Sequence, residues 1–262
     1  MRRALQTSSP LTVAFSSVVV NAIFLWPIAI IFTSFDQAGL EGLLILIFAG
    51  LLAPTLGRLL RFMAVDKLGL ALSAPLVETT PLFGAFLAVT ILQETLTLQI
   101  GIGIVCVVLG VMLFGAREGI RLTKMGVIIS LASAAAFAGS DISRKVGITA
   151  VNSPFLGAAI GVTVAIIVYF LFSVSMNQPI ASPRTWNRYN YLTGILSGAG
   201  ISFIFTALFV ERVIIVQPLL ASTPILTLFF TWIFLRKLER VTSNIAIAAI
   251  LVVVGSIIVA TA

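Results

Sequence analysis

The stretch APLVETTPLF at residues 74–83 contains the side chain best suited to proton or ligand chemistry, the carboxylate of Glu78. Glu78 lies near the middle of a long apolar segment. An ionised carboxylate facing lipid there costs roughly 2.5–3.5 kcal/mol, so Glu78 should be protonated, paired or in a water-filled cavity. Three roles stay open: a titrating group that couples proton movement to another event, a contact for an amine, and a neutral structural carboxyl.

Two prolines, Pro75 and Pro81, flank Glu78 and predict an interrupted helix. Each removes a backbone donor and frees the carbonyl four residues earlier, which for Pro81 is that of Val77. In lipid a freed carbonyl needs another partner. The hydroxyls of Thr79 and Thr80 are expected to supply some of these hydrogen bonds.

The same frame, P-L-x-x-[ST]-T-P, recurs in QPLLASTPIL at residues 217–226, without the carboxylate. Its prolines are Pro218 and Pro224, and Gln217 is a polar residue at the entry to the segment. Two interpretations remain: the copies are kinked packing helices, or they are broken helices that meet at a ligand site.

Two arginines precede the first frame. Arg58 and Arg61 are three residues apart and share a helix face. Both lie within two turns of the expected helix end, so their head groups could reach the interface on extended stems. Alternatively one of them, with Arg58 favoured as the deeper, pairs with Glu78 or holds an anionic ligand group. Thr206 occupies the position of Arg61 in the second copy, so this charge, like that of Glu78, is present in only one of the two copies.

Asp141 is the last candidate. It stands three residues before Arg144 and four before Lys145, so a local ion pair at a helix end explains it adequately. It remains a candidate for the rim of a cavity.

The elements that must position these residues are membrane helices. Of the 262 residues, 60% are hydrophobic and 10% charged, which is too little polar surface for a soluble exterior. A spanning helix needs about 20 mostly apolar residues. That length predicts an all-α membrane bundle of about nine transmembrane helices, at residues 11–33, 41–62, 68–91, 97–115, 124–143, 154–174, 191–210, 213–235 and 244–261.

Charge predicts the orientation. All but three of the 16 Lys and Arg residues fall in connectors or at span ends on one side, the exceptions being Arg144, Lys145 and Arg212. Positive connectors face the cytoplasm, so we expect a multi-pass protein of the cell membrane with its N-terminus inside and its C-terminus outside. Bases in short connectors suit contact with anionic lipid, and nucleic-acid binding is not expected.

Internal repetition divides the chain in two. V-D-K at 65–67 returns as V-E-R at 210–212, and L-Q-E-T-L-T at 92–97 returns weakly as K-L-E-R-V-T at 237–242. Residues 1–116 form a first repeat of four helices, and residues 124–262 a second of five. The helix at 124–143 has no partner in the first repeat, which therefore lacks its first helix. A five-helix unit reinserts upside-down, so the repeats are expected to have inverted topology, as in secondary transporters with a midplane site.

These features resemble the drug/metabolite transporter superfamily, specifically its EamA-type ten-helix carriers. The resemblance covers almost the whole chain and rests on GRLLRFMAVDKLG at 57–69, the duplicated proline frame, the turns at Glu94 and Glu239, and the glycine-rich final helices. It implies a permease that exports a small metabolite or drug-like molecule, with proton coupling left open. The sequence departs from the family in two ways: its first helix is missing, either genuinely or because the start codon was placed too late, and its C-terminus is expected outside.

Other functions fit less well. Histidine is absent, which excludes a serine–histidine hydrolase, and one cysteine offers no metal-type spacing, so we expect no enzyme, cofactor or metal site. A channel-like pore and a non-transporting scaffold remain alternatives. The expected partners are a small-molecule substrate and the lipid bilayer, and a homodimer is left open. The glycines of 101–115 are expected to allow close helix packing.

Overall fold

The computed structural model describes residues 10–35, 38–68, 73, 76–115, 123–175, 183, 186–220 and 243–261. Most of these residues are helical, and none of them forms a strand. The elements are α1 (Pro10–Phe32), α2 (Leu40–Gly50), the π-helix η2 (Leu51–Gly57), α3 (Arg58–Leu68), α5 (Thr80–Ile91), α6 (Leu98–Gly115), α7 (Lys124–Ala150), α8 (Pro154–Ser175), α9 (Arg188–Val210), α10 (Val213–Leu220) and α12 (Ser243–Ala260).

Several helices start where a polar residue caps them. The side-chain oxygens of Thr97, Thr123, Ser153 and Asn187 accept backbone N–H groups of the next turn at 2.8–3.3 Å, at the starts of α6, α7, α8 and α9. Such caps satisfy amide donors that have no partner within the helix. These four starts are therefore encoded locally in the sequence.

Most expected spans agree with the observed helices. α1, α6, α8 and α12 begin and end within one residue of expectation, and α9 begins three residues earlier. Two expected ends are wrong. The helix expected to stop at residue 62 continues to Leu68, after a π-helical stretch, and α7 continues from the expected end at 143 to Ala150. Residues 221–242, which include most of the expected span 213–235, lie outside the described residues.

The π-helix η2 interrupts the long helix of residues 40–68 at a proline. Pro54 has no N–H to give to the Gly50 carbonyl, four residues earlier. The Thr55 hydroxyl points at that carbonyl instead, at 3.5 Å. A π-turn inserts an extra residue into the helix and so shifts the face that all later residues present.

The chain forms two compact units that do not coincide with the sequence repeats. Unit 1 comprises residues 1–55 and 143–210, and unit 2 comprises residues 56–142 and 211–262. Each unit takes helices from both repeats. The division falls inside η2, inside α7, and at the junction between α9 and α10.

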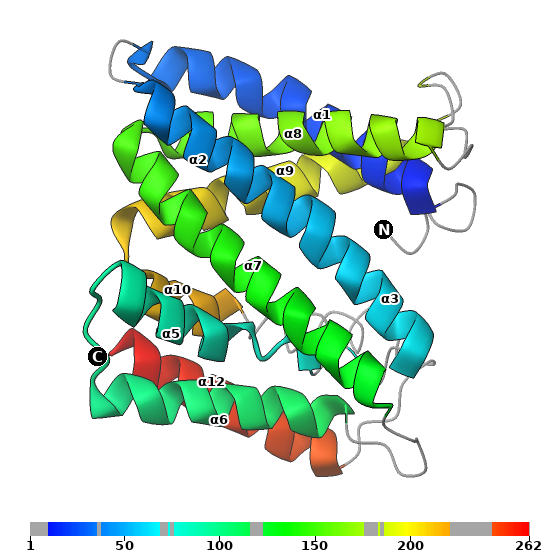
Figure 1. Cartoon of the computed structure of the whole chain (residues 1–262). Helices are drawn as coiled ribbons and strands as arrows, with labels where there is room; N and C mark the ends of the chain where they lie inside the picture. The colour runs from blue at the N-terminus through cyan, green and yellow to red at the C-terminus, as the bar shows by residue number, and fades with distance from the viewer. Residues whose placement is uncertain are drawn as a thin grey trace. The chain divides into compact units, whose positions relative to one another are not determined.

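Unit 1 is built around α1, which packs against α8 and α9 (Figure 1). Val18 of α1 forms a buried cluster with Ala165 and Tyr169 of α8. On the side facing α9, the buried Asn21 accepts a hydrogen bond of 3.1 Å from Ser197. Polar contacts of this kind join membrane helices where apolar burial provides little driving force.

Unit 2 contains a close helix pair, α6 and α12, which run side by side (Figure 1). A Cβ atom added at Gly103 of α6 would come within 2.9 Å of the Gly255 carbonyl oxygen, and one at Gly255 within 2.7 Å of the Gly103 oxygen. The two backbones therefore touch, which confirms the expectation at Gly103. At Gly101 the expectation is wrong, because an added Cβ would meet nothing within 4 Å. α10 packs against α5, α6 and α12.

Among the residues that the structure describes, five helical stretches are long and apolar enough to cross a membrane: Thr12–Phe32, Leu40–Gly57, Lys124–Ala150, Pro154–Ser175 and Arg188–Val210. Large apolar side chains cover their outer faces, among them Ile31 at 73% exposure. Lipid is the solvent that such surfaces require. The fold class is therefore that of an all-α polytopic membrane protein.

Candidate functional site

An ion pair joins the charged residue of the proline frame to α3. Arg61 Nη2 lies 3.1 Å from Glu78 Oε1, and the two side chains are 38% and 23% exposed. Arg58, one turn earlier on the same helix, was favoured from the sequence as the partner, so that choice is corrected. α3 continues to Leu68, so Arg61 lies about two turns before its end and Arg58 about three, farther from the end than expected.

The backbone at Glu78 is interrupted, as the prolines predict. Glu78 and Thr79 form a turn between the short helical stretch at residues 76–77 and the start of α5 at Thr80. The Thr80 hydroxyl donates to the Val77 carbonyl at 2.7 Å, and Thr79 Oγ1 donates to Leu76 O at the same distance. The Val77 carbonyl is the one that Pro81 deprives of an amide partner. The expected role is thus confirmed for Thr80, whereas Thr79 bonds a carbonyl that neither proline frees.

A second polar pair is buried between α7 and α10. Gln217 Nε2 donates to Asp141 Oδ2 at 3.3 Å, and these residues are 2% and 8% exposed. The Gln217 amide lies against Gly84 of α5, where an added Cβ would overlap it. Asp141 stands nine residues before the end of α7, so it is not at a helix end as expected.

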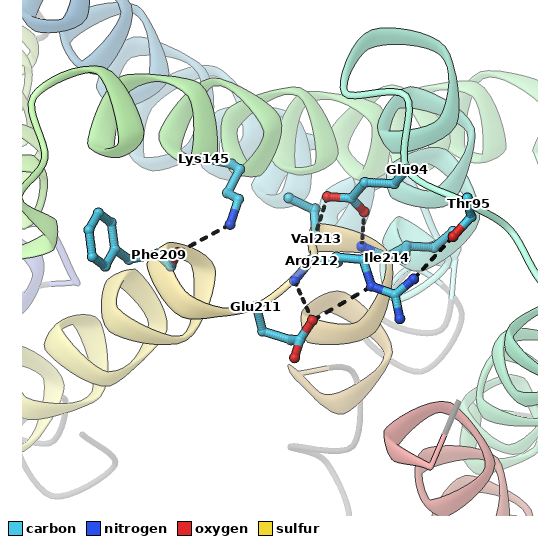
Figure 2. A network of polar contacts seen from close by, with 8 residues as sticks. All are labelled: Glu94, Thr95, Lys145, Phe209, Glu211, Arg212, Val213 and Ile214. Atoms are coloured by element: carbon cyan, nitrogen blue, oxygen red, sulfur yellow. Dashed lines mark hydrogen bonds and ion pairs between the residues drawn. The ribbon is translucent and has the colours of Figure 1, made fainter.

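The two basic residues after Asp141 have contacts of their own, within unit 1. The Arg144 guanidinium lies over the Phe205 ring, 5.2 Å from its centroid. Lys145 Nζ donates to the Phe209 carbonyl at 3.3 Å (Figure 2). A cation at this last turn of α9 interacts favourably with the helix dipole.

A third polar site is formed by Glu94. From the sequence, this residue was identified only as part of a turn that resembles the family, and its contacts were not predicted. Figure 2 shows the Glu94 carboxylate, from the turn after α5, facing the first residues of α10. Glu94 Oε1 and Oε2 accept the backbone N–H groups of Val213 and Ile214, each at 2.9 Å. Arg212 Nη1 donates to Thr95 Oγ1 at 3.2 Å. The repeated L-Q-E-T motif was the available signal, but it did not reveal this partner.

The remaining predicted residues are distributed as follows. Pro81 lies in the first turn of α5, and Pro218 lies inside α10. Thr206 is half-buried on α9 in unit 1, whereas the other described candidates belong to unit 2. Pro75, Pro224 and Glu239 lie outside the described residues. Within the described part of the chain, no cluster of His, Cys, Asp and Glu could hold a metal ion.

The family model described as "EamA-like transporter family" matches residues 1–116 and 124–261. No curated protein matches the chain. A solved structure described only as "Crystal structure of protein" is 15% identical, with a TM-score of 0.74, over 98% of this chain and 90% of that one. At this identity the likeness shows the fold alone. Because the family match spans nearly the whole chain, the protein belongs to the EamA-like transporter family and is a multi-pass membrane transporter of the drug/metabolite type.

Proposed function

We propose that this protein is a secondary active exporter of a small metabolite or drug-like molecule and that Glu78 couples the export to proton movement. The observation that carries the proposal is the ion pair between Glu78 and Arg61 at an interrupted helix inside an apolar segment. Charged residues inside membrane segments line substrate or proton pathways in many transporters. Interrupted helices in carriers supply polar backbone groups to the same pathways.

The direction of coupling follows from the thermodynamics of export. Where the proton gradient points inward, it can drive export only if proton and substrate cross in opposite directions. Glu78 would then carry a proton in one half of the cycle and not in the other. In the deprotonated half, Arg61 at 3.1 Å compensates the carboxylate charge. A cationic or donor group of the substrate could compete for the same carboxylate.

The proposed architecture consists of two inverted repeats, residues 1–116 and 124–262. Movement of one repeat against the other would open a site near the bilayer midplane to each side of the membrane in turn. The family match to residues 1–116 and 124–261 supports a division near residue 120. The distribution of Lys and Arg supports an N-terminus inside and a C-terminus outside. The family is generally non-enzymatic, and we assign no catalytic residue.

The test is a counterflow assay with purified protein in liposomes. The liposomes are loaded with a defined mixture of amino acids, nucleosides and primary amines, and isotope-labelled versions of the same compounds are added outside. Mass spectrometry then measures the uptake of each compound. Saturable uptake of at least one compound, absent from protein-free liposomes, is the expected result. A non-saturating conductance would instead indicate a channel, and no flux of any compound would indicate a scaffold; either result overturns the proposal.

A further inference from the structure

The start of α10 differs from the capped helix starts described above. The residue before it is Arg212, whose side chain has no acceptor atom to bind backbone N–H groups. The amides of Ile215 and Val216 both donate to the Arg212 carbonyl, at 3.2 and 3.1 Å. Those of Val213 and Ile214 donate to Glu94. All four donors of the first turn are satisfied, two of them by a carboxylate from a distant part of the chain.

The turn after α5 is shaped to present this carboxylate. Gln93 has a φ of 56°, in the left-handed region that non-glycine residues rarely occupy. The Glu94 N–H donates to the Ala88 carbonyl at 3.1 Å, so the turn is fastened to the end of α5. The backbone conformation of Gln93 costs free energy, and it directs Glu94 toward α10.

α10 depends on this external cap because a proline weakens its first turns. Pro218 provides no N–H for the Ile214 carbonyl. The turn that lacks this hydrogen bond carries Gln217, three residues after Ile214. The hydrogen bond of Gln217 to Asp141, and the fit of its amide against Gly84, both require α10 to keep this place.

We propose that Glu94 is a positioning residue for transport: by clamping the first turn of α10, it holds Gln217 against Asp141. α5 then contacts α10 at two points, through Glu94 at its C-terminal turn and through Gly84 in its interior. The carboxylate also complements the positive end of the α10 dipole. This inference rests on the proposed transport function, because the pair that Glu94 positions is a candidate substrate site.

The first part of the test measures the clamp itself. Hydrogen exchange of the amides of Val213 and Ile214 is compared between the wild-type protein and Glu94→Gln in nanodiscs. A Gln side chain has one acceptor oxygen where the carboxylate has two, so at least one of the two amides should exchange about tenfold faster or more, the factor expected when one charge-assisted hydrogen bond is lost. Glu41→Gln, at an exposed acid in the first turn of α2, is the matched control and should leave them unchanged. Unchanged exchange in Glu94→Gln overturns the inference.

The second part measures transport, with the same mixture of amino acids, nucleosides and primary amines and with rates expressed per folded molecule. Glu94→Gln should lower the initial rate at least about fivefold. In a Gln217→Leu background it should have no further effect, because Glu94 acts through Gln217. A purely stabilising residue would instead lower the melting temperature and leave the rate per folded molecule unchanged. If Glu94→Gln does not fold, Glu94→Asp takes its place, since its shorter side chain reaches fewer amides.

The outcomes separate the two proposals. Wild-type rates in Glu94→Gln, with faster exchange at Val213 or Ile214, overturn the positioning role and leave the proposed function intact. Equal slowing by Glu94→Gln in the wild-type and Gln217→Leu backgrounds also overturns it. No uptake of any compound by the wild-type protein overturns the proposed function and, with it, the positioning role.

Discussion

Replacing Arg61 with Leu should destabilise the protein because it leaves Glu78 without its ion partner. Removing one member of a fully buried pair costs about 3–5 kcal/mol, whereas exposed pairs contribute at most about 1 kcal/mol. The Arg61 and Glu78 side chains are 38% and 23% exposed, between these limits. We therefore expect Arg61→Leu to lower the free energy of unfolding by about 2 kcal/mol, or the melting temperature by about 4–8 °C.

A double-mutant cycle isolates the pair from other effects of the substitution. The variants are Arg61→Leu, Glu78→Leu and the combination, unfolded thermally in nanodiscs. The double variant should regain most of the stability lost in Arg61→Leu, because no unpaired charge remains in the apolar segment. Arg58→Leu, one turn away on the same helix, is the control, and its coupling to Glu78 should be smaller. Additive losses in the Arg61 cycle would refute the reasoning.

Two further substitutions test the contacts around this site. Gly84→Ala should lower stability by about 1–3 kcal/mol, because the new methyl overlaps the Gln217 amide; thermal unfolding measures it, and an unchanged melting temperature would contradict the close contact. Thr80→Val should cost about 1–3 kcal/mol, because the Val77 carbonyl loses its donor. The control is Thr90→Val, whose hydroxyl bonds a carbonyl inside α5 that keeps its amide partner, and it should cost well under 1 kcal/mol; equal losses in the two threonine variants would argue against that explanation.

Features that depend on nearby residues could be predicted from the sequence. The apolar lengths gave most helix positions, because a bilayer imposes a length on each span. The interrupted helix at Glu78 and the bond from Thr80 to Val77 followed from the missing N–H of Pro81. The close packing of α6 at Gly103 could be predicted because glycine has no side chain to keep a neighbouring helix away.

Features that depend on distant residues could not be predicted. A periodicity of 3.6 places Arg58 and Arg61 on one face, and the π-helix before them shifts that face by an amount the sequence does not specify. Glu94 was missed because its partners on α10 are 119 and 120 residues away. α7 extends past its expected end, and there Lys145 binds a carbonyl of α9.

The most direct test of the account is the response of transport to a proton gradient. Liposomes containing the wild-type protein or Glu78→Gln are loaded with the compounds that counterflow identifies, and efflux is followed at equal pH and after the outside is acidified. Acidification should accelerate efflux by the wild-type protein and leave Glu78→Gln unaffected, whether that variant exchanges substrate or is inactive. An equal acceleration in both proteins would show that Glu78 does not couple protons to transport.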